Sequence, residues 1–149
     1  MPWEITPARE SDIPRLCRLL GVLFVQEAEF TPDESKQAQA LKAIITQPSV
    51  GEILVARDGD NIVGMVSLLY SVSTALGGRV ATMEDMVVEP SHRAEGIGSA
   101  LLEEIVALAN QRACLRLTLL TDAVNLPAQQ FYQRAGFRQS PMIAMRLGL

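Results

Sequence analysis

Two glycines placed two residues apart, Gly96 and Gly98, have the spacing that points most directly to chemistry. They lie in the segment Arg93-Ala94-Glu95-Gly96-Ile97-Gly98-Ser99, which precedes an amphipathic run. If a helix begins here, its first backbone N–H groups have no internal acceptor and lie at the positive end of the helix dipole. Glycine has no Cβ, so a bulky anion can approach the backbone closely. The segment therefore predicts a diphosphate site.

Two other phosphate-binding loops do not fit this segment. A P-loop has Lys followed by Ser or Thr after its second glycine, whereas Ser99-Ala100 follows here. A dinucleotide-binding turn has three glycines and an acidic residue about twenty positions later, a pattern that this sequence does not have. A glycine turn that only starts a helix remains the alternative for the loop taken alone.

Hydrophobic periodicity predicts the elements that hold this loop in place. Strands are expected over residues 3–6, 52–57, 62–70, 79–88, 116–120 and 137–147, and a loop over 71–78. Helices are expected from Ser11 as an N-cap, from Thr31 as an N-cap to Thr46, and over 98–113 and 127–135. A strand, a helix and a strand in succession form a parallel crossover. The pattern predicts a mixed α/β sheet with helices on both faces.

Composition limits the class of protein. The 149 residues, taken as one domain over 1–149, are 48% apolar and 20% charged, which suits a globular protein with a sizeable core. The net charge is −4 and no Lys/Arg cluster occurs, so we expect no nucleic-acid partner. Apolar stretches fall well short of the roughly 20 residues that span a bilayer, and no secretory signal is recognisable, so we expect no membrane association and a cytoplasmic location.

The sulfur and imidazole groups do not predict a metal site. Cys17 and Cys114 lie far apart without a CxxC pair, which is typical of reduced, buried thiols. His92 is the only histidine and has no second ligand at a useful spacing, so it is expected to face solvent or to contact phosphate or adenine. We therefore predict that no metal is bound.

Two motifs together resemble those of the Gcn5-related N-acetyltransferases (GNAT). Arg93-Ala94-Glu95-Gly96-Ile97-Gly98 matches the R/Q-x-x-G-x-G/A signature that follows the fourth strand of this family. Asn125-Leu126-Pro127-Ala128 and Phe131-Tyr132-Gln133-Arg134-Ala135-Gly136-Phe137 resemble its N-x-x-A-x-x-x-Y-x-x-x-G-F pattern. The resemblance is dense from about Arg79 to Phe137. It implies a GNAT fold, with a mostly antiparallel sheet and a parallel crossover between the fourth and fifth strands.

The resemblance also implies acetyl-CoA as co-substrate and assigns residues to it. The backbone amides of Arg93, Ala94, Glu95, Gly96, Ile97, Gly98 and Ser99 would hold its pyrophosphate. The backbone of Met86, Val87 and Val88 would bond the pantetheine arm where two strands splay apart, and an amide of Val87 or Val88 would polarise the thioester carbonyl. Asn125 would steady the cofactor, and Tyr132 would protonate the departing thiolate. The carboxylate of Glu95 departs from the family pattern, because it would repel a diphosphate unless it points outward or pairs with arginine.

An amine acceptor must lose a proton before it attacks, and Glu84 and Asp85 are the candidate bases. Alternation along a strand predicts that only one of them faces a given cleft. Glu84 is favoured over Asp85, while a structural salt bridge or an ordered water are the alternatives. An unpaired charge in the apolar stretch Met83-Glu84-Asp85-Met86 would be costly, which favours a functional reason for at least one acid.

The acceptor itself stays open between a small-molecule amine, an amino sugar, a polyamine and a peptide amine. The family implies that residues 22–30 and 70–78 wall the acceptor cleft, with Glu27 and Glu29 as groups that could attract an amine. The expected activity is N-acetyl transfer in a ternary complex, and the alternative is a non-catalytic acyl-CoA-binding regulatory module. A homodimer is expected because many relatives form one.

Overall fold

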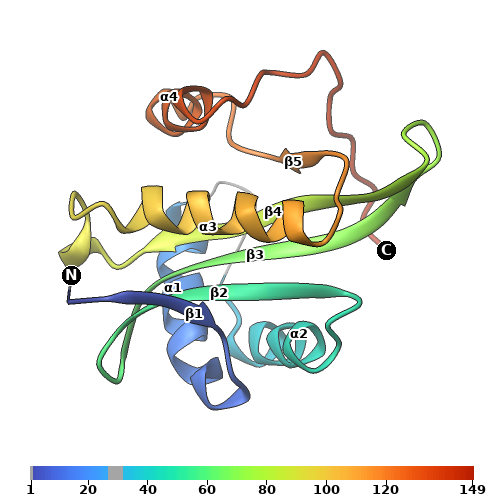
Figure 1. Ribbon diagram of the computed structural model, residues 1–149. Coiled ribbons are helices and arrows are strands. Elements are labelled where there is room, and N and C mark those ends of the chain that lie inside the picture. Colours follow the sequence, from blue (N-terminus) through green and yellow to red (C-terminus); the bar gives the residue numbers. More distant parts are fainter. Residues whose placement is uncertain (1, 27–31) are drawn as a thin grey trace.

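The computed structural model describes residues 2–26 and 32–149 and shows helices packed on a central sheet (Figure 1). The strands are β1 (Glu4–Pro7), β2 (Gly51–Asp58), β3 (Asn61–Ser73), β4 (Gly78–Val88) and β5 (Leu117–Leu119). The α-helices are α1 (Ile13–Gln26), α2 (Glu34–Thr46), α3 (Ile97–Gln111) and α4 (Leu126–Arg134). Short 3₁₀ helices, η1 (Glu10–Asp12) and η2 (Pro90–His92), lie before α1 and α3. In the part of the chain so described, no helix has the length and apolarity to cross a membrane.

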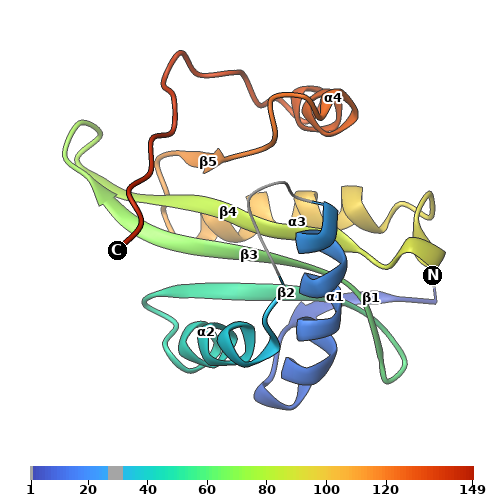
Figure 2. The same cartoon turned by 180° about the vertical axis from the view of Figure 1, so that it is seen from behind.

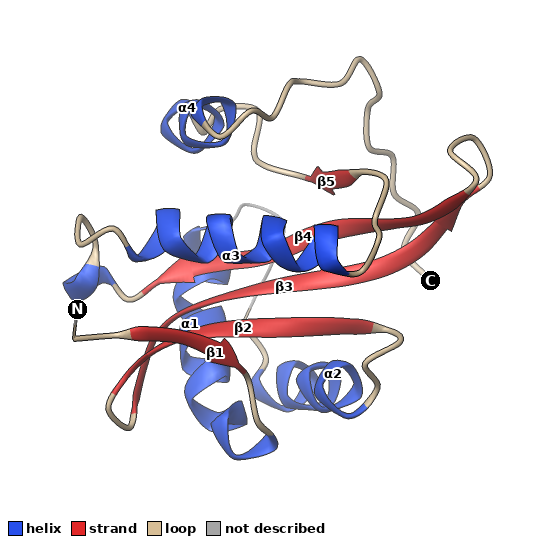
Figure 3. Ribbon diagram, in the orientation of Figure 1, coloured by secondary structure: helices blue, strands red, loops and turns tan. Residues whose placement is uncertain are grey.

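The five strands form one sheet in the order in which they occur along the chain. Strands β1 to β4 pair antiparallel with their neighbours, whereas β4 and β5 are parallel. The parallel pair follows from the crossover through α3, which carries the chain back before β5 begins (Figure 3). The predicted mixed, mostly antiparallel sheet with a parallel crossover is therefore confirmed.

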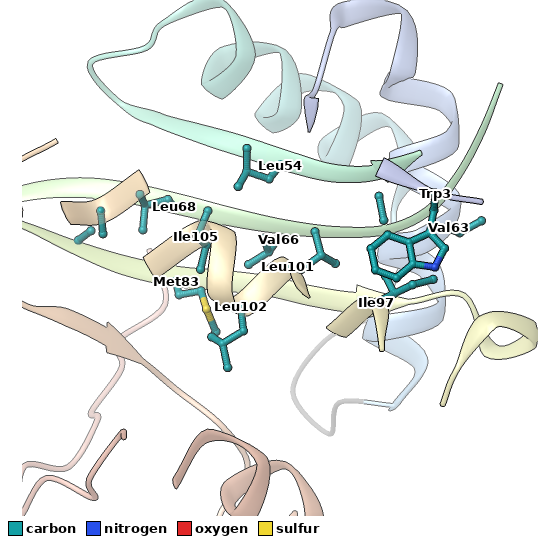
Figure 4. Close-up of a cluster of buried hydrophobic side chains, with 13 residues drawn as sticks. Trp3, Leu54, Val63, Val66, Leu68, Met83, Ile97, Leu101, Leu102 and Ile105 are labelled. Carbon is teal, nitrogen blue, oxygen red and sulfur yellow. The ribbon is translucent and has the colours of Figure 1, made fainter. Parts of the chain in front are cut away.

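Each face of the sheet buries its own apolar cluster. The face against α3 includes Trp3, Val66, Met83, Leu101 and Ile105 (Figure 4). The opposite face, covered by α1 and α2, includes Leu16, Leu20, Leu41, Val55 and Met65 (Figure 2). Both faces of the sheet are covered, so successive residues of β2 are buried on alternate faces. The sequence of this strand is therefore a nearly continuous apolar run and does not alternate between apolar and polar residues.

Helix α3 lies very close to β3 at Gly64. A Cβ at this position would be 3.0 Å from Leu101 Cδ1 and 3.1 Å from Ile97 Cγ2. A larger residue would therefore push the first turns of α3 away from the sheet, since the interior is close-packed. Gly64 thus sets the position of the α3 N-terminus relative to the strands.

Two polar networks fix helix ends to the sheet. Arg57 Nη1 and Nη2 donate to the buried Asp12 carboxylate at 3.0 and 2.8 Å, and these bonds hold the pKa of Asp12 below its usual range. At the other end of the molecule, Arg112 donates to Glu52 at 2.9 and 2.8 Å, and the Tyr70 hydroxyl donates to the same carboxylate. The first network holds the start of α1, and the second holds the end of α3.

Two helix starts differ from the expected ones. Ser11 does not cap a helix but lies inside η1, where the Asp12 carboxylate accepts from the Arg9 N–H at 2.9 Å. The start expected at Thr31 lies outside the described residues. Asp33 is the N-cap of α2 and accepts from a first-turn amide at 3.2 Å.

Two predicted segments near the ends of strands also differ. The loop expected over 71–78 is largely part of the β3–β4 hairpin, whose pairing continues to Ser73 opposite Gly78. The strand expected over 137–147 is not formed, and residues 137–149 carry no helix or strand. The strand β5 is only three residues long, so it gives a following strand little edge to pair with in the same chain.

Candidate functional site

A β-bulge interrupts β4 within its acidic stretch. Glu84 pairs with Ser67 and Val87 pairs with Met65, so β4 has two residues where β3 has one. Asp85 is one of the two, and its φ of 56° lies in the left-handed region that residues other than glycine rarely adopt. A backbone held in such a conformation is typical of sites whose geometry matters for function.

The bulge reverses the alternation of side chains along β4. Met83 packs on the α3 face and Val87 on the opposite face, although they are four positions apart and regular alternation would place them on the same face. The exposed Glu84 shares a face with its partner Ser67, and the half-buried Asp85 places Oδ2 3.5 Å from Ser67 Oγ. Both carboxylates therefore reach the α1–α2 side. The expectation that only one of them faces a given cleft assumed regular alternation, which the bulge interrupts.

Strands β4 and β5 splay apart just before the bulge. β5 pairs only with Ala81 to Met83, while β4 continues to Val88. The Glu89 N–H donates to the Val63 carbonyl on β3 at 2.8 Å. Since successive amides of a strand point to opposite edges, the N–H of Val88 points to the edge that β5 has left. Residues 84–88 thus offer backbone groups to a ligand in the gap.

The glycine loop closes one end of this gap. Ala94 and Gly96 have φ values of 66° and 87°, which bend the chain sharply before α3. The Ala100 N–H donates to the Gly96 carbonyl at 3.0 Å, so the amides of residues 97–99 precede the regular helical bonds. These amides lie at the positive end of a helix of 15 residues.

A cavity of about 520 Å³ connects the loop with the open edge of β4. Nine of the residues predicted to bind a cofactor line it: Met86, Val87, Val88, Arg93, Ala94, Gly96, Ile97, Gly98 and Ser99. Six further residues were not predicted as cofactor-binding: Leu23, Gln26, His92, Pro127, Ala128 and Phe131. Each has a signal in the sequence but none was assigned to the cofactor: His92 adjoins the loop, Leu23 and Gln26 fall in the segment expected to wall the acceptor cleft, and the three residues of α4 belong to the second motif. Their place in this cavity depends on how α1 and α4 pack on the sheet.

The remaining predicted residues lie around the cavity without lining it. Glu95 is exposed and absent from the lining, so its carboxylate does not oppose an anion inside. Asn125 is the N-cap of α4, because its side-chain oxygen accepts from the Ala128 N–H at 3.2 Å. Glu84 and Asp85 lie at the bulge, beyond the end of the lining residues.

Tyr132 is held by aromatic contacts beside the cavity. Its ring meets Phe131 edge-on with centroids 5.2 Å apart, and Phe137 with centroids 5.8 Å apart. Phe131 lines the cavity, and Tyr132 follows it directly on α4. Tyr132 therefore lies next to the cavity wall. Burial raises the pKa of the Tyr132 hydroxyl above its usual value, which keeps the proton on the oxygen at neutral pH.

The acceptor side is described only in part. The wall expected over residues 22–30 is described as far as Gln26, and Glu27 and Glu29 lie outside the described residues. Of the second wall, over residues 70–78, Tyr70 is engaged with Glu52. Within the described ranges, no three His, Cys, Asp or Glu side chains gather in a way that could hold a metal ion.

Comparisons with known proteins agree with this geometry. Residues 15–137 match the model of the "Acetyltransferase (GNAT) family". The chain is 29% identical over 143 residues to the glucosamine 6-phosphate N-acetyltransferase of Trypanosoma brucei brucei, covering 91% of this chain and 88% of that protein. It is 32% identical over 137 residues to the aminoalkylphosphonate N-acetyltransferase of Salmonella typhimurium, covering 92% and 86%. The crystal structure of a possible acetyltransferase from Clostridium difficile 630 shares the fold, with a TM-score of 0.88 at 18% identity over 99% of this chain and 97% of that chain.

Proposed function

The chain belongs to the GNAT family of acetyltransferases, and from that premise we propose that its cavity binds acetyl-CoA and that the acetyl group passes directly to a primary amine. One observation carries this proposal: the free amides of residues 97–99 and the open edge of β4 line the same cavity. An anionic group and an extended amide-containing chain can bind there together. Acetyl-CoA has both, and its thioester supplies the activated acetyl group.

The loop fits a diphosphate on steric and electrostatic grounds. The first-turn amides of α3 belong to residues that line the cavity, and no carboxylate is among the lining residues that the structure describes. A Cβ on Gly98 would lie 3.8 Å from Val88 Cγ2 and from Phe131 Cζ, so glycine leaves the space between β4 and α4 open. Arg93 adds a positive charge at the exposed rim.

The open edge of β4 fits an extended ligand arm. The N–H of Val88 points into the gap and can donate to an acceptor there. In a regular sheet, the same N–H would donate to a carbonyl of the neighbouring strand. A fixed backbone dipole next to the reacting carbonyl also stabilises negative charge that develops on its oxygen. The outward direction of the Val88 N–H supports the expectation that residues 86–88 bind the pantetheine arm as a neighbouring strand would be bound.

Tyr132 is the proposed general acid. Its pKa is raised by burial, so the hydroxyl keeps its proton at neutral pH and can give it to a departing thiolate. The ring contacts with Phe131 and Phe137 restrict the direction of the hydroxyl. These contacts supply the positioning that such a proton transfer requires.

Glu84 is the proposed base for the incoming ammonium group. It is the first residue of β4 beyond the last pair with β5, and its side chain is exposed on the α1–α2 side. Asp85 lies next to it, but its carboxylate is near Ser67 Oγ. Because Asp85 is half-buried against Ser67, it is less accessible to an acceptor and is the weaker candidate. The acceptor is proposed to be a small amine, in line with the small amines in the names of the two relatives.

The experiment that tests this function measures thiol release from acetyl-CoA over a panel of amines. We expect wild-type protein to turn over at least one of them, with Tyr132→Phe lowering kcat by about 10²- to 10⁴-fold and leaving KM for acetyl-CoA nearly unchanged. Because the pKa of Tyr132 is raised, wild-type activity should persist to alkaline pH and fall only as the hydroxyl ionises.

Tyr70→Phe is the matched control, because it removes the same hydroxyl from a tyrosine engaged with Glu52 outside the cavity. It should change kcat by less than ten-fold. Equal effects of the two substitutions would contradict the acid role of Tyr132. Binding of acetyl-CoA without thiol release on any amine would favour the non-catalytic acyl-CoA-binding module instead.

A further inference from the structure

His92, the only histidine of the chain, is one of the residues that line the cavity. It is the last residue of η2, which lies at the end of the sheet where α3 begins (Figure 1). Its side chain is half-buried, whereas the neighbouring Ser91 and Arg93 are exposed. The imidazole therefore faces the same cavity as the free amides of residues 97–99, which are proposed to hold the diphosphate.

The backbone of η2 attaches His92 to the sheet. The His92 N–H donates to the Glu89 carbonyl at 2.9 Å. Glu89 is in turn joined to β3, because its own N–H donates to the Val63 carbonyl at 2.8 Å. The position of His92 is thus set by main-chain bonds that need no ligand, and its side chain is left for another use.

The two ring nitrogens of His92 have different surroundings. Nδ1 lies 3.1 Å from Ser91 Oγ, a hydroxyl that can donate to the neutral ring and accept from the protonated one. Nε2 has no hydrogen-bond partner within residues 2–26 and 32–149. With Nδ1 bonded to Ser91 in either state, Nε2 carries a hydrogen in both. The ring therefore offers a ligand one donor at every pH, and adds a positive charge when it is protonated.

The cavity gives a protonated His92 no counter-ion. Among the described lining residues, Arg93 is the only other one with a charged side chain, and its Nε donates to the Val88 carbonyl at 3.4 Å. The nearest acids in the sequence, Glu89 and Glu95, do not line the cavity. The residues that α1, β4 and α4 contribute to the lining carry no titratable side chain. An imidazolium at this position is therefore balanced inside the cavity only by an anion that a ligand brings.

We propose that Nε2 of His92 binds the diphosphate of acetyl-CoA and that protonation of the ring strengthens this bond, so that affinity for the co-substrate rises as the pH falls. This inference rests on the proposed function, because it concerns the same anion site. An imidazole changes its charge between about pH 5 and 8, whereas a diphosphate diester keeps both of its charges throughout this range. The backbone amides thus supply the part of the affinity that is independent of pH, and His92 supplies the part that depends on it.

The proposal links two measurable quantities. A nearby anion favours the charged form of the ring, so the bound ligand should raise the pH at which His92 titrates. By reciprocity, the factor by which the ligand favours the proton equals the factor by which the proton favours the ligand. The titration of the ring and the affinity for the ligand must therefore change together.

Isothermal titration with acetyl-dephospho-CoA at two pH values tests the affinity. This probe keeps the diphosphate but lacks the 3′-phosphate, a monoester whose own second ionisation falls at about pH 6. Wild-type protein should bind the probe about ten-fold more tightly at a pH of about 5.5 than at about 8.5, which lie on either side of the range where imidazole titrates.

Two substitutions reproduce the two charge states of the ring. His92→Gln has a neutral amide donor, so at both pH values it should bind the probe as weakly as wild-type protein does at alkaline pH. His92→Arg is positively charged throughout, so at both pH values it should bind as tightly as wild-type protein does at acidic pH. If His92 served only the structure of η2, each substitution would change the affinity by the same factor at both pH values.

Proton NMR measures the titration of the ring directly. Because His92 is the only histidine, its C2 proton gives a single imidazole signal in protein free of a histidine tag. The midpoint of its titration should rise by about one pH unit when the protein is saturated with the probe. A pH-independent affinity of the wild-type protein, or a midpoint that the probe leaves unchanged, would overturn the role of His92 and leave the cavity as the co-substrate site. No binding of the probe or of acetyl-CoA at either pH would contradict the proposed function itself, and this inference with it.

Discussion

At the residue scale, Glu84 and Asp85 are adjacent acids that the bulge places on the same side of the sheet. Their environments differ, because Glu84 is exposed while Asp85 is half-buried near Ser67 with a left-handed backbone. A base must be accessible to the acceptor, whereas a residue in a strained turn can serve by shaping the backbone. The two acids are therefore expected to have separable roles.

Substitution of each acid by its amide tests this division. Glu84→Gln should lower kcat/KM for the amine by about 10²- to 10⁴-fold at neutral pH. Asp85→Asn keeps a residue that tolerates positive φ, so it should lower kcat/KM by less than ten-fold. Steady-state kinetics of the wild-type protein and the two variants at neutral pH check both statements.

The reverse order of effects would assign the base to Asp85. If neither substitution lowers kcat/KM by more than ten-fold, an ordered water accepts the proton instead. The measurement thus decides between the alternatives that the sequence leaves open.

At the element scale, the loop before α3 could be predicted from the sequence because its properties are local. Positive φ at Gly96 and the free amides of a first helical turn need no tertiary information. The crossover was predictable for the same reason, since it depends on the order of elements. The bulge could not be predicted from the sequence, because the pairing of Glu84 with Ser67 depends on the register between two strands and not on either strand alone.

The cavity walls from α1 and α4 were also beyond local reasoning. Leu23 and Gln26 read as ordinary positions of an amphipathic helix and line the cavity only through packing. The strand expected over 137–147 has the right alternation, but the single chain gives it no partner. A pattern can show that a segment is fit to pair without showing what it pairs with.

Helix α4 depends on its cap, and Asn125 tests this. The side-chain oxygen of Asn125 accepts from the Ala128 N–H, so Asn125→Ala should lower stability by about 1 kcal/mol. It should also raise KM for acetyl-CoA, because Pro127, Ala128 and Phe131 of α4 line the cavity. Thermal unfolding and steady-state kinetics measure the two effects.

Asn125→Asp is the control, since Asp is an equally good N-cap. If capping is the only role of this residue, Asn125→Asp should have the stability and the KM for acetyl-CoA of the wild-type protein. If Asn125→Asp has wild-type stability but a raised KM for acetyl-CoA, Asn125 contacts acetyl-CoA directly.

At the scale of the whole molecule, the site joins parts that are distant in sequence. The α3 N-terminus is set by the close approach at Gly64, and its far end is held by the pair of Glu52 and Arg112. The start of α1, which supplies another wall, is held by Asp12 and Arg57. The cavity is thus open between β4 and α4, while the elements around it are fixed to the sheet.

The most direct test of this account is isothermal titration of the protein with acetyl-CoA, in parallel with Gly98→Glu and Ala107→Glu. A side chain at position 98 meets only ordinary contacts with Val88 and Phe131, so the first variant should fold and place a carboxylate at the free amides. Ala107→Glu adds the same charge to an exposed position of the same helix. We predict that wild type and Ala107→Glu bind within two-fold of each other and that Gly98→Glu binds at least a hundred-fold more weakly. No heat with wild-type protein, or equal binding by all three, would contradict the claim that the α3 N-terminus holds the diphosphate of acetyl-CoA.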